Sequence, residues 1–233
     1  MTSNSNGCGG TERCGCGTEA NQPAHVESNA EAGDGDPSSP DPIDGRWIDD
    51  PASADSTLPD DVRAAMERWL ETDGIETVAD CFAAIRRRVG NGSLAVADLC
   101  HADGETDHRG VLEGETYHFR CFYDAVLLAE LGDSPVTIRT VAPDGTEITG
   151  RVSDAGEPTV EPAGATMSFG IAADANPLST ADRRLGAAYE AICPFVRAFP
   201  DRASYGTWAA TVPAATIATP LADATELAGL LLE

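Results

Sequence analysis

HFRCFYDAVLLAELG, residues 118–132, joins a short strand-like segment to an apolar helix. Thr116 to Arg120 suit a strand, whereas the large apolar residues that follow recur at helical spacing. Cys121 and Asp124 stand at the junction. Positions i and i+3 lie on one face of a helix, with Cβ atoms about 5–6 Å apart. The pattern therefore places a thiol and a carboxyl in one small volume.

Helices are predicted on the N-terminal side of this junction. Residues 58–71 carry Pro59 and two aspartates at a helix start, followed by one apolar stripe. Residues 75–89 repeat this periodicity and stop at the glycines of GNG. A third helix is expected over Leu94 to Cys100, and the polar segment Thr106 to Gly114 is expected to form turns.

The C-terminal side is rich in predicted strands. SPVTIRTV, GTEITGRVS and TVEPAGATMSFGI read as strands, and Asp144-Gly145 suits a hairpin turn between the first two. Helices are expected from Ser179 through Tyr189, from Asp201 to Ala210 and from Asp223 to Leu232, with a strand at ATIAT. Helices followed by a mixed or antiparallel sheet with interleaved helices indicate an α+β fold.

The first 57 residues have a different composition. They are dominated by small, polar and acidic residues, which bury too little apolar surface to offset the entropy of ordering, so we predict a disordered acidic tail. Cys8, Cys14 and Cys16 are spaced unlike the paired cysteines of zinc fingers. The tail is either a loose catcher of soft metal ions or an inert solvated segment. The predicted division is 1–57, 58–115 and 116–233.

The charge of the chain limits its partners. The net charge is −24, and all basic residues are arginine. A lysine-free, acidic surface suits a salt-rich cytoplasm, in which salt screens the repulsion between like charges. Nucleic acid is not expected as a partner, because phosphate contacts need clustered basic residues. We also expect no membrane association, since the sequence has no long apolar run and no signal peptide.

Cys193 is the second notable cysteine. Pro194 follows it, which favours an extended or turn conformation at Cys193. The seven cysteines of a cytoplasmic protein are expected to be thiols. If the fold brings them together, Cys121, Cys193 and Asp124 would offer two soft sulfur ligands and one acid.

The sequence resembles the alkylmercury lyase family, also called organomercurial lyases, in three ordered blocks. CFYD matches the Cys-x-x-Asp of the family, VEPAG matches a family strand, and CPFVRAFPDRASYGTW matches the segment that begins with the second catalytic cysteine. The resemblance covers residues 58–233 and implies that Cys121, Asp124 and Cys193 are catalytic. It also implies a winged-helix-like region over 58–115. The acidic composition suggests a haloarchaeal-type member.

The resemblance implies cleavage of a carbon–mercury bond by protonolysis, as in mercury resistance and detoxification. Cys121 or Cys193 would bind the organomercurial first, because thiolates are the preferred donors for soft metals. Asp124 would pass a proton to the carbon and could also contact the metal. The products would be a hydrocarbon and Hg(II) held by Cys121 and Cys193. No cofactor is needed, and small external thiols would remove the Hg(II). We expect a monomer or a weak homo-oligomer.

Other interpretations remain open. The same two cysteines would also suit a protein that binds, delivers or senses Hg(II) or Cu(I) without turnover, and the helical region would suit a metal-responsive regulator. Family differences leave the preferred organic group undecided: VTIRTVAPDG lacks the cysteine that some members carry there. The remaining candidates are given structural roles: Cys81 in the core, Cys100 and His101 in a loop, His118 beside the site, and Tyr123 and Trp208 in packing.

Overall fold

The computed structural model describes residues 44–48, 53–89, 94–132, 134–153, 156–178 and 190–232. The predicted tail, its three cysteines and the predicted helix from Ser179 to Tyr189 lie wholly or mainly outside these residues. Within them, helices and antiparallel sheets alternate as expected for an α+β fold. No helix in the described ranges has both the length and the apolar character needed to cross a membrane.

The first two helices form largely where the sequence predicts them. Helix α1 spans Asp60–Leu70, with Pro59 at its N-cap, and buries one stripe that includes Trp69. Helix α2 spans Val78–Val89 and begins three residues later than predicted. The delay has a local cause: the Thr77 hydroxyl accepts from the Asp80 amide, and the Asp80 carboxylate accepts from the Thr77 amide. This reciprocal pair makes Thr77 the residue that caps the helix.

A five-stranded antiparallel sheet follows, in the order β2-β1-β3-β4-β5. The turn segment predicted over Thr106 to Gly114 is wrong, because most of it forms strand β1. Polar residues on its solvent side hide the alternation that buries His108 and Gly110. The predicted hairpin at Asp144-Gly145 is confirmed, with Gly145 at a φ of 90°. The strands are β1 (His108–Leu112), β2 (Glu115–Phe119), β3 (Val136–Val141), β4 (Glu147–Ser153) and β5 (Gly156–Glu161).

A second, three-stranded sheet has the order β7-β6-β8. The single strand predicted over residues 159–171 is two strands, β5 and β6, which belong to different sheets and are separated by a turn after Glu161. Strand β6 is buried along nearly its whole length. The remaining elements are β6 (Thr166–Ala172), β7 (Ala198–Phe199), α5 (Arg202–Ala209), β8 (Ala214–Pro220) and α6 (Ala224–Leu232).

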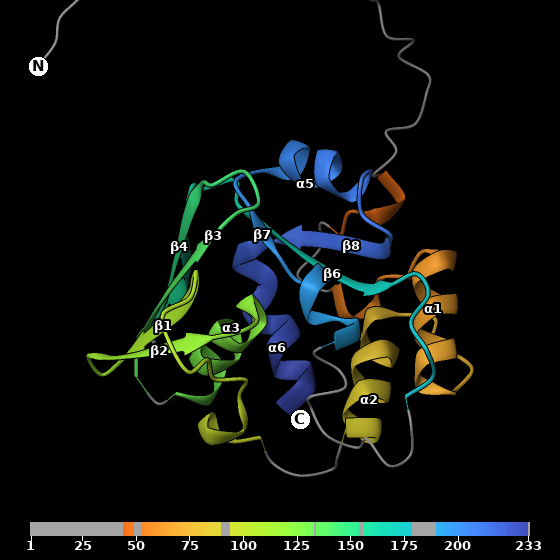
Figure 1. Cartoon of the computed structure of the whole chain (residues 1–233), viewed down its shortest axis with the longest axis horizontal. Helices are drawn as coiled ribbons and strands as arrows, with labels where there is room; N and C mark the ends of the chain where they lie inside the picture. The colour runs from red at the N-terminus through yellow and green to blue at the C-terminus, as the bar shows by residue number, and fades with distance from the viewer. Residues whose placement is uncertain are drawn as a thin grey trace, which may run out of the picture. The chain divides into compact units, whose positions relative to one another are not determined.

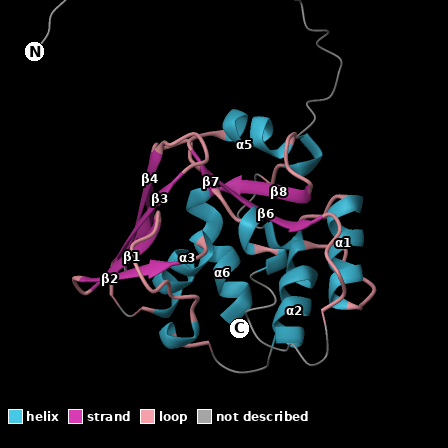
Figure 2. Cartoon of the chain, in the orientation of Figure 1, coloured by secondary structure: helices cyan, strands magenta, loops and turns pink. Residues whose placement is uncertain are grey.

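Helix α3, Phe122–Leu131, lies at the centre of this arrangement. It packs against β1 and β3 on one side and against α6 on the other, and α6 in turn packs against α2 (Figure 1). Strands β6 and β8 run beside each other and contact α1 (Figure 2). Since α3 is covered by several elements, most of its residues are buried, including Asp124. Polar side chains at the N-terminus of α3, such as that of Asp124, are therefore shielded from solvent.

Candidate active site

Cys121 lies at the N-cap of α3, where strand β2 ends and the helix begins. Its backbone is extended, with φ −124° and ψ 140°, and its side chain makes no capping hydrogen bond. The side chain is 2% exposed. A helix N-terminus favours negative charge, as a thiolate carries. Serine and aspartate are common at the N-cap, but in this helix the N-cap residue is Cys121.

Asp124 lies in the first turn of the same helix and is also 2% exposed. Its Oδ1 accepts a hydrogen bond from the backbone amide of Cys100, with an N–O distance of 3.1 Å. A carboxyl removed from water in this way needs such partners, because burial of an unpaired charge is costly. The carboxyl is therefore held in place by the loop that precedes β1.

Cys193 begins the short 3₁₀ helix η4, Cys193–Phe195. The prediction that Pro194 favours an extended or turn conformation is confirmed as a turn: the Val196 amide donates to the Cys193 carbonyl at 3.2 Å. Ser168 of β6 holds this turn in place through two hydrogen bonds. Its hydroxyl donates to the Phe195 carbonyl at 2.8 Å and accepts from the Arg197 amide at 3.1 Å.

The fold brings these three side chains together. The Cys193 thiol is hydrogen-bonded to the side chain of Cys121, and this contact raises the pKa of Cys193. Burial raises the pKa further, as do the negative charges of Cys121, Asp124 and Cys100. The raised pKa favours the protonated form of Cys193. Two sulfur atoms and a carboxyl share one environment although Cys193 lies far along the chain from the other two.

Cys100 is the residue of this environment that the sequence did not indicate. It lies in a loop, as predicted, but that loop runs beside the start of α3. Its amide donates to Asp124, and its carbonyl accepts from the amide of Arg120 at 3.0 Å. Cys100 is partly exposed. The only sequence signal was a cysteine that precedes β1, the strand that pairs with β2 and therefore returns the chain to Cys121.

The other candidates lie as follows. Cys81 is in the core, as predicted, and burial followed by the charge of Asp80 raises its pKa to about 12. The Nδ1 of His118 accepts from the amide of Thr106 at 3.2 Å. The Trp208 ring packs against Phe199, with ring centroids 5.1 Å apart.

Tyr123 follows the first cysteine closely in sequence and in space. Its hydroxyl is buried and finds no hydrogen-bond partner among the described residues. Burial raises its pKa well above the usual value, and the charge of Cys121 adds to this effect. Its ring packs near that of Phe82, with centroids 6.3 Å apart. The expected packing role agrees with these contacts.

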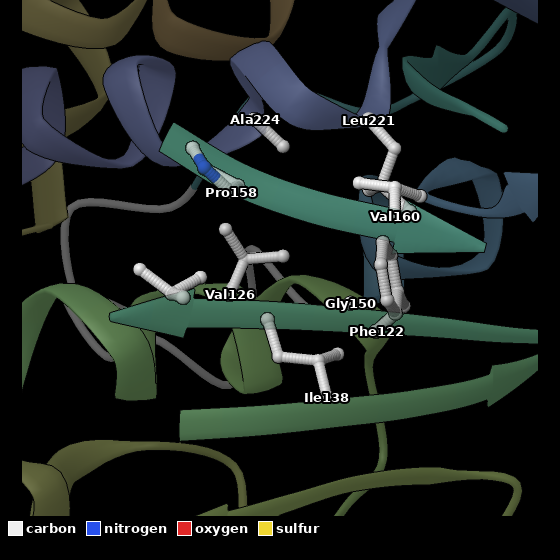
Figure 3. A pocket seen from close by; sticks show the side chains of 9 residues that line it. Phe122, Val126, Ile138, Gly150, Pro158, Val160, Leu221 and Ala224 are labelled. Atoms are coloured by element: carbon white, nitrogen blue, oxygen red, sulfur yellow. The ribbon is translucent and has the colours of Figure 1, made fainter. Parts of the chain in front are cut away.

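An apolar hollow lies on the sheet side of α3 (Figure 3). Its empty volume is about 280 Å³, part of which is open to solvent. Phe122, the neighbour of Cys121, reaches into it from α3, together with Val126. The remaining lining comes from β3, β4, β5 and the start of the C-terminal helical segment: Ile138, Gly150, Val152, Pro158, Val160, Leu221 and Ala224.

No group of three or more His, Cys, Asp or Glu side chains within the described ranges converges tightly enough to hold a metal ion by itself. The site is instead a hydrogen-bonded pair of thiols with a neighbouring carboxyl, which also bonds to the amide of Cys100. Two thiols suit a soft ion, which binds sulfur in preference to oxygen.

Known proteins were compared with the chain in sequence and in structure. No curated protein matches the chain. The solved structure titled "Crystal structure of the mercury-bound form of MerB2" is similar, with 16% identity and a TM-score of 0.41. The match covers 55% of this chain and 58% of that one, so the chain spans little more than half the length of this relative. The family model for alkylmercury lyase matches residues 102–233, which is more than half of the chain and includes Cys121, Asp124 and Cys193. The chain belongs to the alkylmercury lyase family.

Proposed function

We propose that the protein is an organomercurial lyase, which cleaves a carbon–mercury bond and yields a hydrocarbon and Hg(II). The observation that carries this proposal is the hydrogen-bonded pair of Cys121 and Cys193, which shares its surroundings with the buried carboxyl of Asp124. Membership in the family supports the same reaction.

The first step uses Cys121. The raised pKa of Cys193 favours its thiol form, and Cys121 lies at the N-cap of α3, so we assign the first attack to Cys121. Its thiolate bonds to the mercury of R–Hg–X and displaces X⁻. The product of this step is R–Hg–S, with the sulfur from Cys121 and the carbon still attached.

The second step moves the remaining proton. The Cys193 thiol passes its proton to the Asp124 carboxylate, and the Cys193 thiolate then bonds to the same mercury. Two sulfur donors increase the electron density on the carbon, which weakens the bond that must break. Asp124 delivers the proton to that carbon, R–H leaves, and Hg(II) stays between the two sulfur atoms. The carboxylate is thereby restored.

Asp124 suits this role because of its surroundings. It is 2% exposed, and the Cys100 amide holds one of its oxygens at 3.1 Å. General acid–base catalysis by a positioned group contributes about 10²- to 10⁴-fold to a rate. No resident cofactor has a role in this sequence of steps. Small external thiols would exchange with the protein sulfurs and carry the Hg(II) away.

Hydrocarbon formation tests the proposal. The purified protein is incubated in high salt with a phenylmercury salt and excess thiol, and benzene is measured by gas chromatography. We expect turnover by the wild type, a loss of about 10²- to 10⁴-fold in Asp124→Asn, and retained binding of one Hg(II) by that variant. Asp174→Asn, a change at an exposed aspartate, is the matched control and keeps full activity.

Two results would point elsewhere. Benzene formation no faster than without protein, combined with tight Hg(II) binding, would indicate a soft-metal carrier in place of a lyase. Equal activity of Asp124→Asn and wild type would remove Asp124 from the mechanism.

We also infer the setting in which this reaction takes place. The lysine-free, acidic composition supports a salt-rich cytoplasm. The proposed cleavage of organomercurials suits a role in mercury detoxification. The correspondence of residues 58–115 with the winged-helix-like region of the family, and the monomeric or weakly associated state, are proposals of the same kind. Size-exclusion chromatography in concentrated KCl, with light scattering, measures the state of association.

A further inference from the structure

Cys100 is placed beside the reacting groups by two backbone hydrogen bonds. Its amide donates to Asp124 Oδ1 at 3.1 Å, and its carbonyl accepts from the Arg120 amide at 3.0 Å. The neighbouring residue, His101, forms an isolated bridge with Phe119. These contacts hold the Cys100 loop against the chain that leads into α3, so the position of Cys100 is defined on both sides.

The thiol of Cys100 also acts on the catalytic pair. Its charge contributes to raising the pKa of Cys193, as do the charges of Cys121 and Asp124. The hydrogen bond from its amide to Asp124 places Cys100 beside the carboxyl that shares its surroundings with the catalytic pair. It lies two positions before the segment that matches the family model, so the match does not assign it a role.

Exposure distinguishes the three sulfurs. Cys121 is 2% exposed, whereas Cys100 and Cys193 are partly exposed. Thiolates bind Hg(II) tightly, and exchange between sulfur ligands requires an incoming thiol that reaches the metal. A protein thiol at the rim would supply the incoming ligand at high effective concentration.

We propose that Cys100 is a relay thiol that takes Hg(II) from the Cys121–Cys193 pair and presents it to external thiols. This inference rests on the proposed lyase function. A new bond forms between the Cys100 sulfur and Hg(II), the bond to Cys193 breaks, and the proton of the Cys100 thiol passes to the Cys193 sulfur. Two external thiols then displace Cys100 and Cys121 in turn, and no oxidation or reduction occurs.

The arrangement favours sequential action over a three-sulfur site. Among the described residues, no three metal-binding side chains converge on one point, which agrees with Cys100 acting after the pair and not together with it. It is a neighbour of the pair and reaches the metal only after the hydrocarbon has left. The expected effect of losing Cys100 is therefore on Hg(II) release and not on bond cleavage.

The test separates these two steps in full-length protein. Cys8, Cys14 and Cys16 are replaced by serine in every sample, so that no tail thiol contributes. Benzene from one equivalent of phenylmercury without external thiol reports cleavage, and transfer of Hg(II) from HgCl₂-loaded protein to glutathione reports release. We expect Cys100→Ser to cleave at the wild-type rate and to release Hg(II) several-fold more slowly. A small dithiol at high concentration restores fast release.

Cys81→Ala is the matched control, because it removes a core thiol that lies apart from the site, and it leaves both rates unchanged. Cys100→Ala is the second variant should Cys100→Ser fold poorly. Unchanged release in a folded Cys100 variant overturns the relay, and slower cleavage together with slower release also overturns it, because Cys100 would then act by positioning Asp124. The HgCl₂ measurement needs no lyase activity, so failure of the proposed function would be seen separately, as an absence of benzene from the wild type.

Discussion

The Cys193 thiol shows how a single residue acquires its chemistry from its neighbours. A cysteine alone titrates near pH 8.5. Here the hydrogen bond to Cys121, burial and three nearby charges all raise its pKa, so the protonated form predominates at neutral pH. In the proposed reaction, the proton needed for bond cleavage is thus stored on the sulfur that later binds the product.

Replacing Cys121 tests this interaction. In Cys121→Ser the hydrogen bond that contributes most to raising the pKa of Cys193 is weakened, and the charge of Cys121 is lost. The pKa of Cys193 falls toward its ordinary value, so at a given pH more of it is thiolate. We expect faster alkylation of Cys193 by iodoacetamide between about pH 7 and 10, measured by peptide mapping. Cys81, whose pKa burial raises to about 12, is the internal control and keeps its labelling rate. An identical pH profile in wild type and variant would show that the two thiols do not interact.

The site residues differ in how far the sequence could identify them. Cys121 and Asp124 are linked by local spacing at a helix start, which can be recognised from a few residues. Cys193 was joined to them only through resemblance to the family, because no local pattern shows which distant segments meet. Cys100 was assigned to a loop without a role. Its contact with Asp124 depends on the pairing of β1 with β2, and the sequence had not indicated β1.

At the scale of elements, β6 supports the turn that carries Cys193. Ser168 is fully buried, and its hydroxyl bonds to the carbonyl of Phe195, the last residue of η4, and to the amide of Arg197 two residues later. Ser168→Ala would leave the partly buried Phe195 carbonyl and Arg197 amide each without this hydrogen bond. We expect a loss of about 1–3 kcal/mol in the free energy of unfolding, measured in urea, and a lower rate of benzene formation. Ser153→Ala, at an exposed position of β4, is the control and changes neither quantity measurably.

Two glycines in strands give opposite predictions. A Cβ on Gly170 of β6 would lie 2.8 Å from the Ala215 carbonyl oxygen and 2.6 Å from Thr216 Cγ2, so β6 and β8 would have to separate. A Cβ on Gly150 of β4 would meet Ile138 at an ordinary 3.7 Å. We expect Gly170→Ala to cost about 1–3 kcal/mol and Gly150→Ala to be tolerated, as measured by thermal unfolding. Equal melting temperatures for the two variants would contradict the close packing of β6 on β8.

The elements themselves were predicted unevenly, for physical reasons. Helices α1, α5 and α6 and strands β3, β4 and β8 follow from periodicity and from capping residues. Strand β1 was missed for two reasons. Its outward side chains are polar, and it is held by pairing with β2 on one side and β3 on the other, which cannot be inferred from local composition. The split between β5 and β6 was missed because VEPAG turns within an otherwise continuous apolar pattern.

The net negative charge of the whole molecule opposes its compact state, because like charges repel each other. The chain carries a net charge of −24, and the five ion pairs among the described residues all use arginine and are largely exposed. Exposed pairs contribute little, about 0–1 kcal/mol each, so they do not offset the repulsion. Salt shortens the reach of this repulsion, from about 10 Å at 0.1 M to about 3 Å at 1 M.

Salt dependence of stability follows from this balance. We expect the melting temperature to rise as KCl is increased from about 0.1 M to above 1 M, measured by circular dichroism. The reason is that screening relieves the repulsion in the compact state more than in the expanded chain. A melting temperature that does not change with salt would show that the acidic surface is not adapted to concentrated salt.

In the proposed reaction, the sulfur atoms of Cys121 and Cys193, two residues distant along the chain, bind one mercury atom while the carbon–mercury bond is broken. X-ray absorption at the mercury edge tests it directly, on the protein mixed with one equivalent of phenylmercury and no external thiol. We expect mercury bound by two sulfur atoms, with no carbon ligand left. Mercury that still carries its carbon and holds a single sulfur would show that the two cysteines do not act together in cleavage.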